Sequence, residues 1–239
     1  MKNGYVCIVR LICCCALLFV GNAQAADNYV GLAFSHSSGT YGTDVTTKLN
    51  RWVVNAGVLK THLFAGVSVP YISLDSEGNS SQNGLGDIIA NVGYRTERSQ
   101  KGFASEYSVA VKFPTADDSK SLGTGETDMG GFASMSKQWN DIIGSLGAGY
   151  IVVGNPSGGT YKNVSHFSLS LFKRFHNVGA NVYMNYRSAV IEGAHDAVES
   201  GVSAYYVLSN NLGISGDAYA GLTEGSPDYG LQLGIVRWF

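Results

Sequence analysis

The chain has 239 residues, 45% of them hydrophobic and 14% charged, with a formal net charge of −2 at pH 7. Acidic residues slightly outnumber basic ones, which argues against a nucleic-acid-binding protein that works through a basic surface. Beyond Ala25, no run of apolar residues is long enough to cross a membrane as a helix.

The start of the chain has the three parts of a secretory signal peptide. Lys2 and Arg10 flank and enter an apolar run, residues 11–20, and Ala23-Gln24-Ala25 supplies the small-residue cleavage site. The run is shorter than the roughly 20 apolar residues of a spanning helix, and an uncleaved interfacial anchor stays open as an alternative. We therefore expect a signal peptide over residues 1–25 and one mature domain over residues 26–239.

The four cysteines all lie inside that signal peptide, at Cys7, Cys13, Cys14 and Cys15. A mature chain without cysteine has no disulfide framework and no Cys/His metal cluster. The glycine-rich segment 144–150 lacks both the spacing and the following helix of a dinucleotide site. We expect no metal and no cofactor.

Side chains alternate between apolar and polar along much of the mature chain. In residues 177–190, Val178, Val182 and Met184 share one face, while Asn181 and Asn185 share the other. This period of two is typical of a strand whose two faces meet different surroundings. The same alternation occurs, in chain order, in residues 62–71, 87–95, 103–113, 166–175, 212–222 and 229–239. The registers near residues 45–58 and 127–139 are ambiguous.

The connections between these segments alternate in length. Short ones cover residues 59–61, 97–102, 138–141, 175–177 and 209–211, and mostly longer Gly/Ser/Asp-rich ones cover residues 35–44, 75–84, 114–126, 154–163, 191–197 and 223–228. Short turns on one side and long loops on the other are typical of an outer-membrane barrel. The count predicts an all-β, transmembrane antiparallel barrel of about 12 strands, with 10 or 14 as alternatives. A secreted β-sandwich is the less favoured alternative.

The last strand ends on an aromatic residue, which a sandwich has no reason to place at a free terminus. Tyr229, Leu231 and Phe239 share one face, and Gly234 and the terminal Phe239 resemble the carboxyl-terminal targeting signal of outer-membrane barrels. Arg237 departs from that signal, which prefers an aromatic residue there. We expect this strand to contact the barrel assembly machinery. Aromatic anchors at the membrane interfaces are predicted at Phe113, Phe175, Tyr186 and Phe239.

The inward faces of the predicted strands carry charges of both signs. The candidates for lumen or selectivity residues are Asp87, Arg95, Glu106, Lys112, Asp128, Arg187, Glu199 and Asp217, with His166 as a further inward group. Structural ion pairs and a selectivity role are both open for them. Asp87 and Asp128 each follow a glycine turn, so turn capping competes with a polar constriction or a cation site.

A family resemblance rests on four local motifs. These are GVSVPY (66–71), GLGDI (84–88) leading to Gly93-Tyr94-Arg95, VKFPT (111–115) and LGTGETD (122–128). Over residues 66–154 the chain resembles the outer-membrane family named for the MetA pathway of phenol degradation, whose members are regarded as transporters. The resemblance implies uptake of small aromatic or other hydrophobic compounds, and it transfers no catalytic or binding residue to this chain.

We therefore expect a passive channel for small, hydrophobic or aromatic solutes in the outer membrane of a Gram-negative bacterium. Its partners are outer-membrane lipids, lipopolysaccharide and the solute. Tyr183, Tyr205 and Tyr219 face the lumen, where their rings can stack on a solute.

Two other functions stay open. The first is a closed structural or surface-interaction barrel. Inward glycines such as Gly179, Gly201 and Gly230 argue against it if they leave room for water in the lumen. The same glycines can equally relieve crowding where strands coil. The second is an outer-membrane lipid hydrolase using His36 or His195, both in predicted outer loops. No G-x-S-x-G motif supports it, so we do not expect an enzyme.

Overall fold

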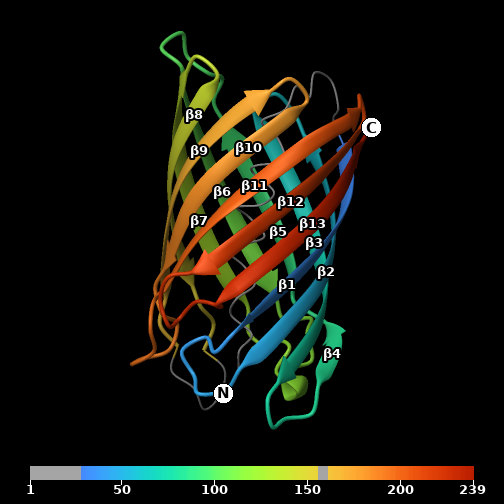
Figure 1. Ribbon diagram of the computed structural model, residues 1–239, viewed down its shortest axis with the longest axis vertical. Helices are drawn as coiled ribbons and strands as arrows, with labels where there is room; N and C mark the ends of the chain where they lie inside the picture. The colour runs from blue at the N-terminus through green and yellow to red at the C-terminus, as the bar shows by residue number, and fades with distance from the viewer. Residues whose placement is uncertain (1–27, 156–160) are drawn as a thin grey trace.

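The computed structural model describes residues 28–155 and 161–239, and these form a barrel of antiparallel strands (Figure 1). The predicted signal peptide lies outside the described residues. The strands are β1 (Asn28–Gly39), β2 (Thr47–Leu59), β3 (Leu63–Ser76), β4 (Gln82–Leu85), β5 (Ile88–Arg95), β6 (Phe103–Phe113), β7 (Asp128–Trp139), β8 (Ile142–Val152), β9 (Val164–Phe175), β10 (Val178–Arg187), β11 (Ala197–Ser209), β12 (Leu212–Gly221) and β13 (Tyr229–Trp238). One 3-10 turn, η2 (Asp118–Lys120), lies between β6 and β7.

The barrel closes through its first and last strands. β1 pairs with β13, with Tyr29 opposite Trp238, and also with β2, with Tyr29 opposite Gly57. The short β4 pairs with β3 alone, so a ring of 12 strands remains when it is set aside. The predicted outer-membrane barrel of about 12 strands is confirmed.

The connections have the predicted asymmetry. In Figure 1 the short turns and the C-terminus lie at the top, and the longer connections, with β4, lie at the bottom. We call these the short-turn end and the loop end. Within the described ranges, none of the helical segments has the length and hydropathy that membrane crossing requires.

The two faces of each strand differ as the alternation predicted. On β13, Leu231, Leu233 and Ile235 are exposed on the outside, whereas Val236 is 4% exposed inside. The two segments of ambiguous register form β2 and β7, and burial alternates along both of them. On β7 the small residues Gly131 and Ala133 face outward and Phe132 faces inward. The larger apolar side chain therefore lies on the inner face at this point, the reverse of the arrangement on β13.

Aromatic rings cover inward glycines of neighbouring strands. Tyr205 is paired with Gly179, and a Cβ built on this glycine would overlap the Tyr205 ring. The same relationship joins Phe64 with Gly93, Phe132 with Gly149, Tyr183 with Gly201 and Tyr219 with Gly230. Such packing protects the backbone of a curved sheet where a side chain is missing. The space beside these glycines is therefore filled by aromatic rings. It is not available to water, a possibility that the sequence left open.

Apolar packing concentrates in the loop-end half of the interior. Ile89, Ala110, Ile151 and Val164, inward residues of β5, β6, β8 and β9, form one buried cluster with Val153 and Val190 from the adjoining loops. Leu49 and Ile72 form a second with Leu122, which comes from the connection between β6 and β7. The loop end is thus packed like a protein core.

Candidate functional site

The short-turn half of the barrel holds a cavity of about 710 Å³. Its walls come from β5 to β13, and its mouth includes Thr96, Arg98 and Asp141 in the short turns. The cavity therefore opens at the short-turn end and deepens toward the packed clusters. A cavity of this size accommodates a small solute rather than a folded partner.

Hydroxyl groups recur along the cavity wall, between apolar side chains such as Phe172. The lining serines at inward positions of β7, β8, β9, β11 and β12 are Ser134, Ser136, Ser145, Ser168, Ser170, Ser203 and Ser215. Each hydroxyl can donate one hydrogen bond and accept two. These hydroxyl groups can form hydrogen bonds with either water or a polar solute, so replacing one by the other costs little free energy.

Charged groups in the cavity face one another. Arg95 Nε and Glu106 Oε2 are 3.9 Å apart, and each side chain is 29% exposed. Tyr183 donates its hydroxyl proton to Asp217 Oδ2 over 2.7 Å. Arg174 also lines the cavity. Three of the predicted lumen charges, Arg95, Glu106 and Asp217, thus lie together in one polar cavity.

Three further predicted residues form a buried cluster nearer the loop end. The Lys112 ammonium lies 2.8 Å from Asp128 Oδ2, 3.4 Å from Asp87 Oδ2 and 2.9 Å from the Thr124 hydroxyl. Lys112, Asp87 and Asp128 are at most 5% exposed, and Thr124 is 1% exposed. Ions buried this deeply require partners of opposite charge.

The same carboxylates hold loop backbone. Asp87 Oδ1 accepts a hydrogen bond from the Ala116 amide over 3.0 Å, and Asp128 Oδ1 accepts one from the Gly154 amide over 2.9 Å. Segment 114–127 is further held by Leu122, which is 3% exposed in the second apolar cluster. Lys112 and Asp87 therefore connect this segment to the barrel wall, and Asp128 pairs with Lys112 while it holds Gly154 in the connection after β8. We call this arrangement the Lys112 latch.

The remaining predicted charges lie on the inner face near the loop end. Arg187 ends β10 and is paired across the ladder with His166, whose side chain is buried. Glu199, 8% exposed, is paired with Asn185. The structure thus distributes the eight predicted charges among the cavity, the latch and this inner surface.

Sequence reasoning missed several interior residues. Arg51 is 4% exposed on β2, with Ser35 Oγ 3.4 Å from its Nε, and Asn181 is 4% exposed on β10. The inward phase of β10 already contained Asn181, whereas the ambiguous register of β2 concealed Arg51. Thr124 belongs to a loop, and no local pattern distinguishes it from its neighbours.

The three predicted lumen tyrosines line the cavity with their rings held against the wall. Besides covering Gly179, Tyr205 stacks on Phe172 with ring centroids 6.0 Å apart at 7°. Tyr219 is 8% exposed. Solute therefore meets their edges and hydroxyls more readily than their faces.

The predicted interface anchors lie at both ends of the barrel. Phe113 is exposed at the loop end, and Phe175 and Phe239 are exposed at the short-turn end. Tyr186 donates its hydroxyl to Asp196 in the connection between β10 and β11. That hydrogen bond and one from the Ala189 amide lower the pKa of Asp196, the amide having the larger effect.

The residues considered for a hydrolase do not assemble. The prediction that His36 lies in a loop is wrong, because β1 continues to Gly39; the His36 ring stands near Tyr229 and its Nδ1 is 2.8 Å from Asn50 Oδ1. His195 Nε2 lies 3.0 Å from Glu224 Oε2 in exposed loops. Within residues 28–155 and 161–239, no group of three or more potential His, Cys, Asp or Glu ligands is placed to hold a metal ion.

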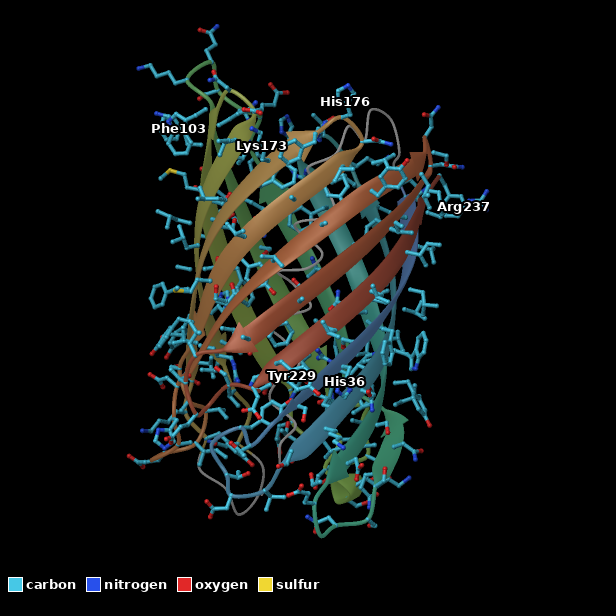
Figure 2. All side chains as sticks on the ribbon, viewed as in Figure 1. His36, Phe103, Lys173, His176, Tyr229 and Arg237 are labelled. Atoms are coloured by element: carbon cyan, nitrogen blue, oxygen red, sulfur yellow. The ribbon has the colours of Figure 1, made fainter. Side chains whose placement is uncertain are left out.

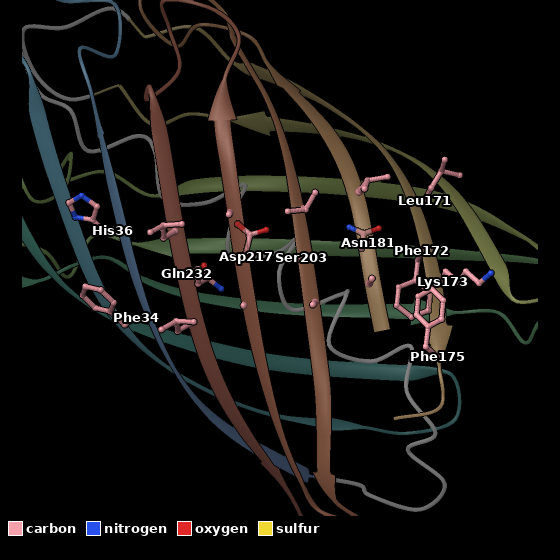
Figure 3. Close-up of a pocket in the computed structure, with 18 of the residues that line it drawn as sticks. Phe34, His36, Leu171, Phe172, Lys173, Phe175, Asn181, Ser203, Asp217 and Gln232 are labelled. Atoms are coloured by element: carbon pink, nitrogen blue, oxygen red, sulfur yellow. The ribbon is translucent and has the colours of Figure 1, made fainter. Parts of the chain in front are cut away.

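An apolar groove of about 930 Å³ crosses the outside of β9 to β13. Small outward residues, Ala180, Ala204 and Ala218, form its floor. Figure 3 shows Lys173 and Phe175 close together on one side of this region and His36 on the other. In a membrane-spanning barrel such a groove faces lipid.

Comparison with solved structures places the fold among outer-membrane barrels. The β domain of the Bordetella autotransporter BrkA has a TM-score of 0.58 at 11% identity, covering 90% of this chain and 100% of that one. The KdgM porin in complex with oligogalacturonate has a TM-score of 0.58 at 8% identity, covering 87% and 99%. The CymD monoaromatic hydrocarbon channel has a TM-score of 0.50 at 9% identity, covering 90% and 89%.

These structural similarities, at identities of 8–11%, show the fold alone, a porin-like outer-membrane β-barrel. No family model matches the chain, and no curated protein matches it either. The resemblance to the MetA-pathway family therefore rests on the four sequence motifs.

Proposed function

We propose that this chain is an outer-membrane channel for the passive uptake of small solutes. The hydroxyl-lined cavity at the short-turn end carries the proposal, because it provides a polar interior with room for a solute. The similarity to the KdgM porin and the CymD channel supports the same kind of function.

The wall chemistry favours small polar solutes. Serine hydroxyls and the paired charges of Arg95 and Glu106 can replace the water that a sugar or amino acid leaves behind. Uptake of hydrophobic or aromatic solutes is the narrower hypothesis, motivated by the MetA-pathway motifs. It has less support from the cavity, because the faces of Tyr205 and Tyr219 lie against glycines.

Passage through the loop end requires movement of segment 114–127. This segment buries Leu122 and Thr124 among inward residues of the barrel. Solute can therefore cross the loop end only when segment 114–127 moves out of the barrel. The Lys112 latch holds the closed arrangement. We therefore describe the channel as gated.

A closed structural barrel is the second candidate, favoured by the two apolar clusters of the loop-end half. Liposome swelling separates the two. The refolded mature chain is placed in liposomes and challenged with sugars, amino acids and phenol-like aromatics of matched size. Swelling with the polar solutes supports the proposal, selective swelling with aromatics supports the narrower hypothesis, and an absence of swelling with every solute supports the closed barrel.

A further inference from the structure

Charge is separated between the two ends of the barrel. Apart from the inward acids Asp87, Asp128 and Glu199, which are matched in number by the inward bases Lys112, Arg51 and Arg187, the described acidic residues of the loop end are Asp44, Asp75, Glu77, Asp117, Asp118, Glu126, Glu192, Asp196, Glu224 and Asp228, opposed there by Lys48, Lys120 and Lys162. Apart from the paired Arg95 and Glu106, the basic residues of the short-turn end are Lys60, Arg98, Lys101, Lys137, Lys173, Arg174 and Arg237, opposed there by Glu97 and Asp141. The short-turn end is therefore positive and the loop end is negative.

Several cations of the short-turn end stand beside outward aromatic rings. Lys137 Nζ lies 4.7 Å from the centre of the Phe103 ring and 5.5 Å from that of Trp139. Lys173 Nζ lies 5.2 Å from the Phe175 ring centre. Phe103, Trp139 and Phe175 are each more than a third exposed.

The last strand repeats this pairing. The Arg237 guanidinium carbon lies 5.3 Å from the centre of the Phe239 ring, and Phe239 is 62% exposed. Figure 2 shows Phe103, Lys173 and Arg237 around the upper end of the barrel, which is the short-turn end. These cation–aromatic pairs form a collar, which we define as Lys137, Lys173 and Arg237 with their rings.

The position of the collar determines its surroundings. Exposed aromatic rings at the end of a barrel wall lie at the lipid headgroups, so the cations beside them lie at the level of the phosphates. A basic side chain at that depth attracts anionic lipid at about 1 kcal/mol per charge. Asp141, whose Oδ2 is 3.0 Å from Lys173 Nζ, weakens this attraction at one site of the collar.

The apolar groove continues from the collar along the barrel. Lys173 and Phe175 both border it, and Leu171 and Ala180 line it further along the wall. A lipid whose headgroup is bound at Lys173 would thus place an acyl chain in this apolar groove. Because the acyl chain is already out of water in the bilayer, its contact with the groove contributes van der Waals packing rather than hydrophobic transfer.

We propose that the collar is a binding surface for anionic glycerophospholipid, with headgroup phosphates at Lys137, Lys173 and Arg237 and, for the lipid at Lys173, an acyl chain in the groove. The carboxylates of the loop end disfavour the same headgroup at the opposite interface. This interaction depends on the barrel spanning a bilayer, and it does not depend on whether the lumen conducts solute.

Lipid retention tests the proposal. The barrel is reconstituted in mixed phosphatidylcholine and phosphatidylglycerol, extracted in mild detergent, and its bound lipids are quantified by mass spectrometry. Wild type is expected to retain phosphatidylglycerol above its bulk fraction, with up to about a fivefold contribution from each cation. The variant Lys137→Gln/Lys173→Gln/Arg237→Gln is expected to lose the enrichment, and the loop-end control Lys48→Gln/Lys120→Gln/Lys162→Gln is expected to keep it.

Heat-modifiable gel mobility confirms that each variant is folded. Equal enrichment in wild type and in the folded collar variant overturns the proposal, as does an absence of enrichment in wild type. If the collar variant does not fold, a salt titration of wild type decides the matter. Enrichment that falls between 0.05 and 0.5 M salt, about the range over which screening becomes strong, supports the proposal, and salt-independent enrichment overturns it.

Discussion

The ammonium group of Lys112 lies 2.8 Å from Asp128 Oδ2, and the two side chains are 2% and 1% exposed. They come from adjacent strands, where Lys112 of β6 is directly opposite Asp128 at the start of β7. The segment between them, 113–127, therefore begins and ends at one buried ion pair. Its two ends cannot separate without exposing or breaking that pair.

Removing the lysine is expected to release this segment. Lys112→Met leaves Asp87 and Asp128 buried without their cation, and breaking a buried pair in this way destabilises a fold by about 3–5 kcal/mol. We expect faster proteolysis within residues 114–127 and a lower free energy of unfolding in urea. Lys120→Met is the control, because Lys120 is exposed and its pairing with Asp117 spans 3.6 Å. Equal protease resistance in both variants would contradict the latch.

The glycines covered by rings are expected to reject side chains. In Gly230→Ala the new methyl overlaps the Tyr219 ring, and such overpacking destabilises by about 1–3 kcal/mol. Gly131→Ala is the matched control, since nothing lies within 4 Å of its Cβ. The heat-induced shift in gel mobility compares the two variants. A similar unfolding temperature for both would show that the ring does not rest on Gly230.

Asp217 is expected to influence ion preference. It lines the cavity and accepts the Tyr183 hydroxyl. A unit charge about 4 Å from an ion contributes roughly 1 kcal/mol in water, which is about fivefold in occupancy. Asp217→Asn should therefore reduce the cation-to-anion permeability ratio by up to about that factor in reversal-potential recordings. Asp75→Asn, on the outside of β3, should leave the ratio unchanged, and an unchanged ratio in both would place the ion path elsewhere.

Asp196 is expected to titrate below the ordinary range of an aspartate. Its carboxylate accepts hydrogen bonds from the Ala189 amide and the Tyr186 hydroxyl, which lower its pKa. A lowered pKa means that the contribution of Asp196 to loop stability is complete above the pKa of an unfolded aspartate, about 3.9. It is lost as the pH falls through the lower native value. The carboxyl carbon shift in NMR follows this titration, and Tyr186→Phe should move it to higher pH. A midpoint at or above the ordinary value would refute the assignment.

Much of the fold follows from the period of two. Alternation along residues 103–113 and 229–239 gave the inward and outward faces correctly, because lipid selects apolar side chains on one face at every crossing. The alternation of apolar and polar residue types is lost where this selection by lipid is weaker, although inward and outward positions still alternate. On β7, outward Gly131 and Ala133 alternate with inward Phe132, since a ring that covers Gly149 is needed inside.

The candidate site was less accessible to sequence reasoning. The inward phase identified Asp87, Lys112 and Asp128 but not their pairing, because the cluster requires the start of β5, the end of β6, the start of β7 and a folded-in loop to meet. The serine and glycine run after His36 predicts a loop, whereas β1 continues to Gly39, because strands of a barrel can extend past the apolar band with polar residues on both faces. Segment 114–127 has the composition of a solvated loop, and only its tertiary contacts at Leu122 and Thr124 reveal that it enters the barrel.

A cysteine pair across the closed segment tests the gated channel most directly. Leu122 and Ile72 belong to one buried cluster, and every cysteine of the chain lies in the predicted signal peptide, so Ile72→Cys/Leu122→Cys is designed to introduce a single switchable bond into the mature domain. Single-channel conductance is recorded in planar bilayers before and after addition of a reductant. We predict silence in the oxidised protein and wild-type openings after reduction. Equal conductance in both states, or silence in wild type and in both states of the variant, would contradict a channel gated by residues 114–127.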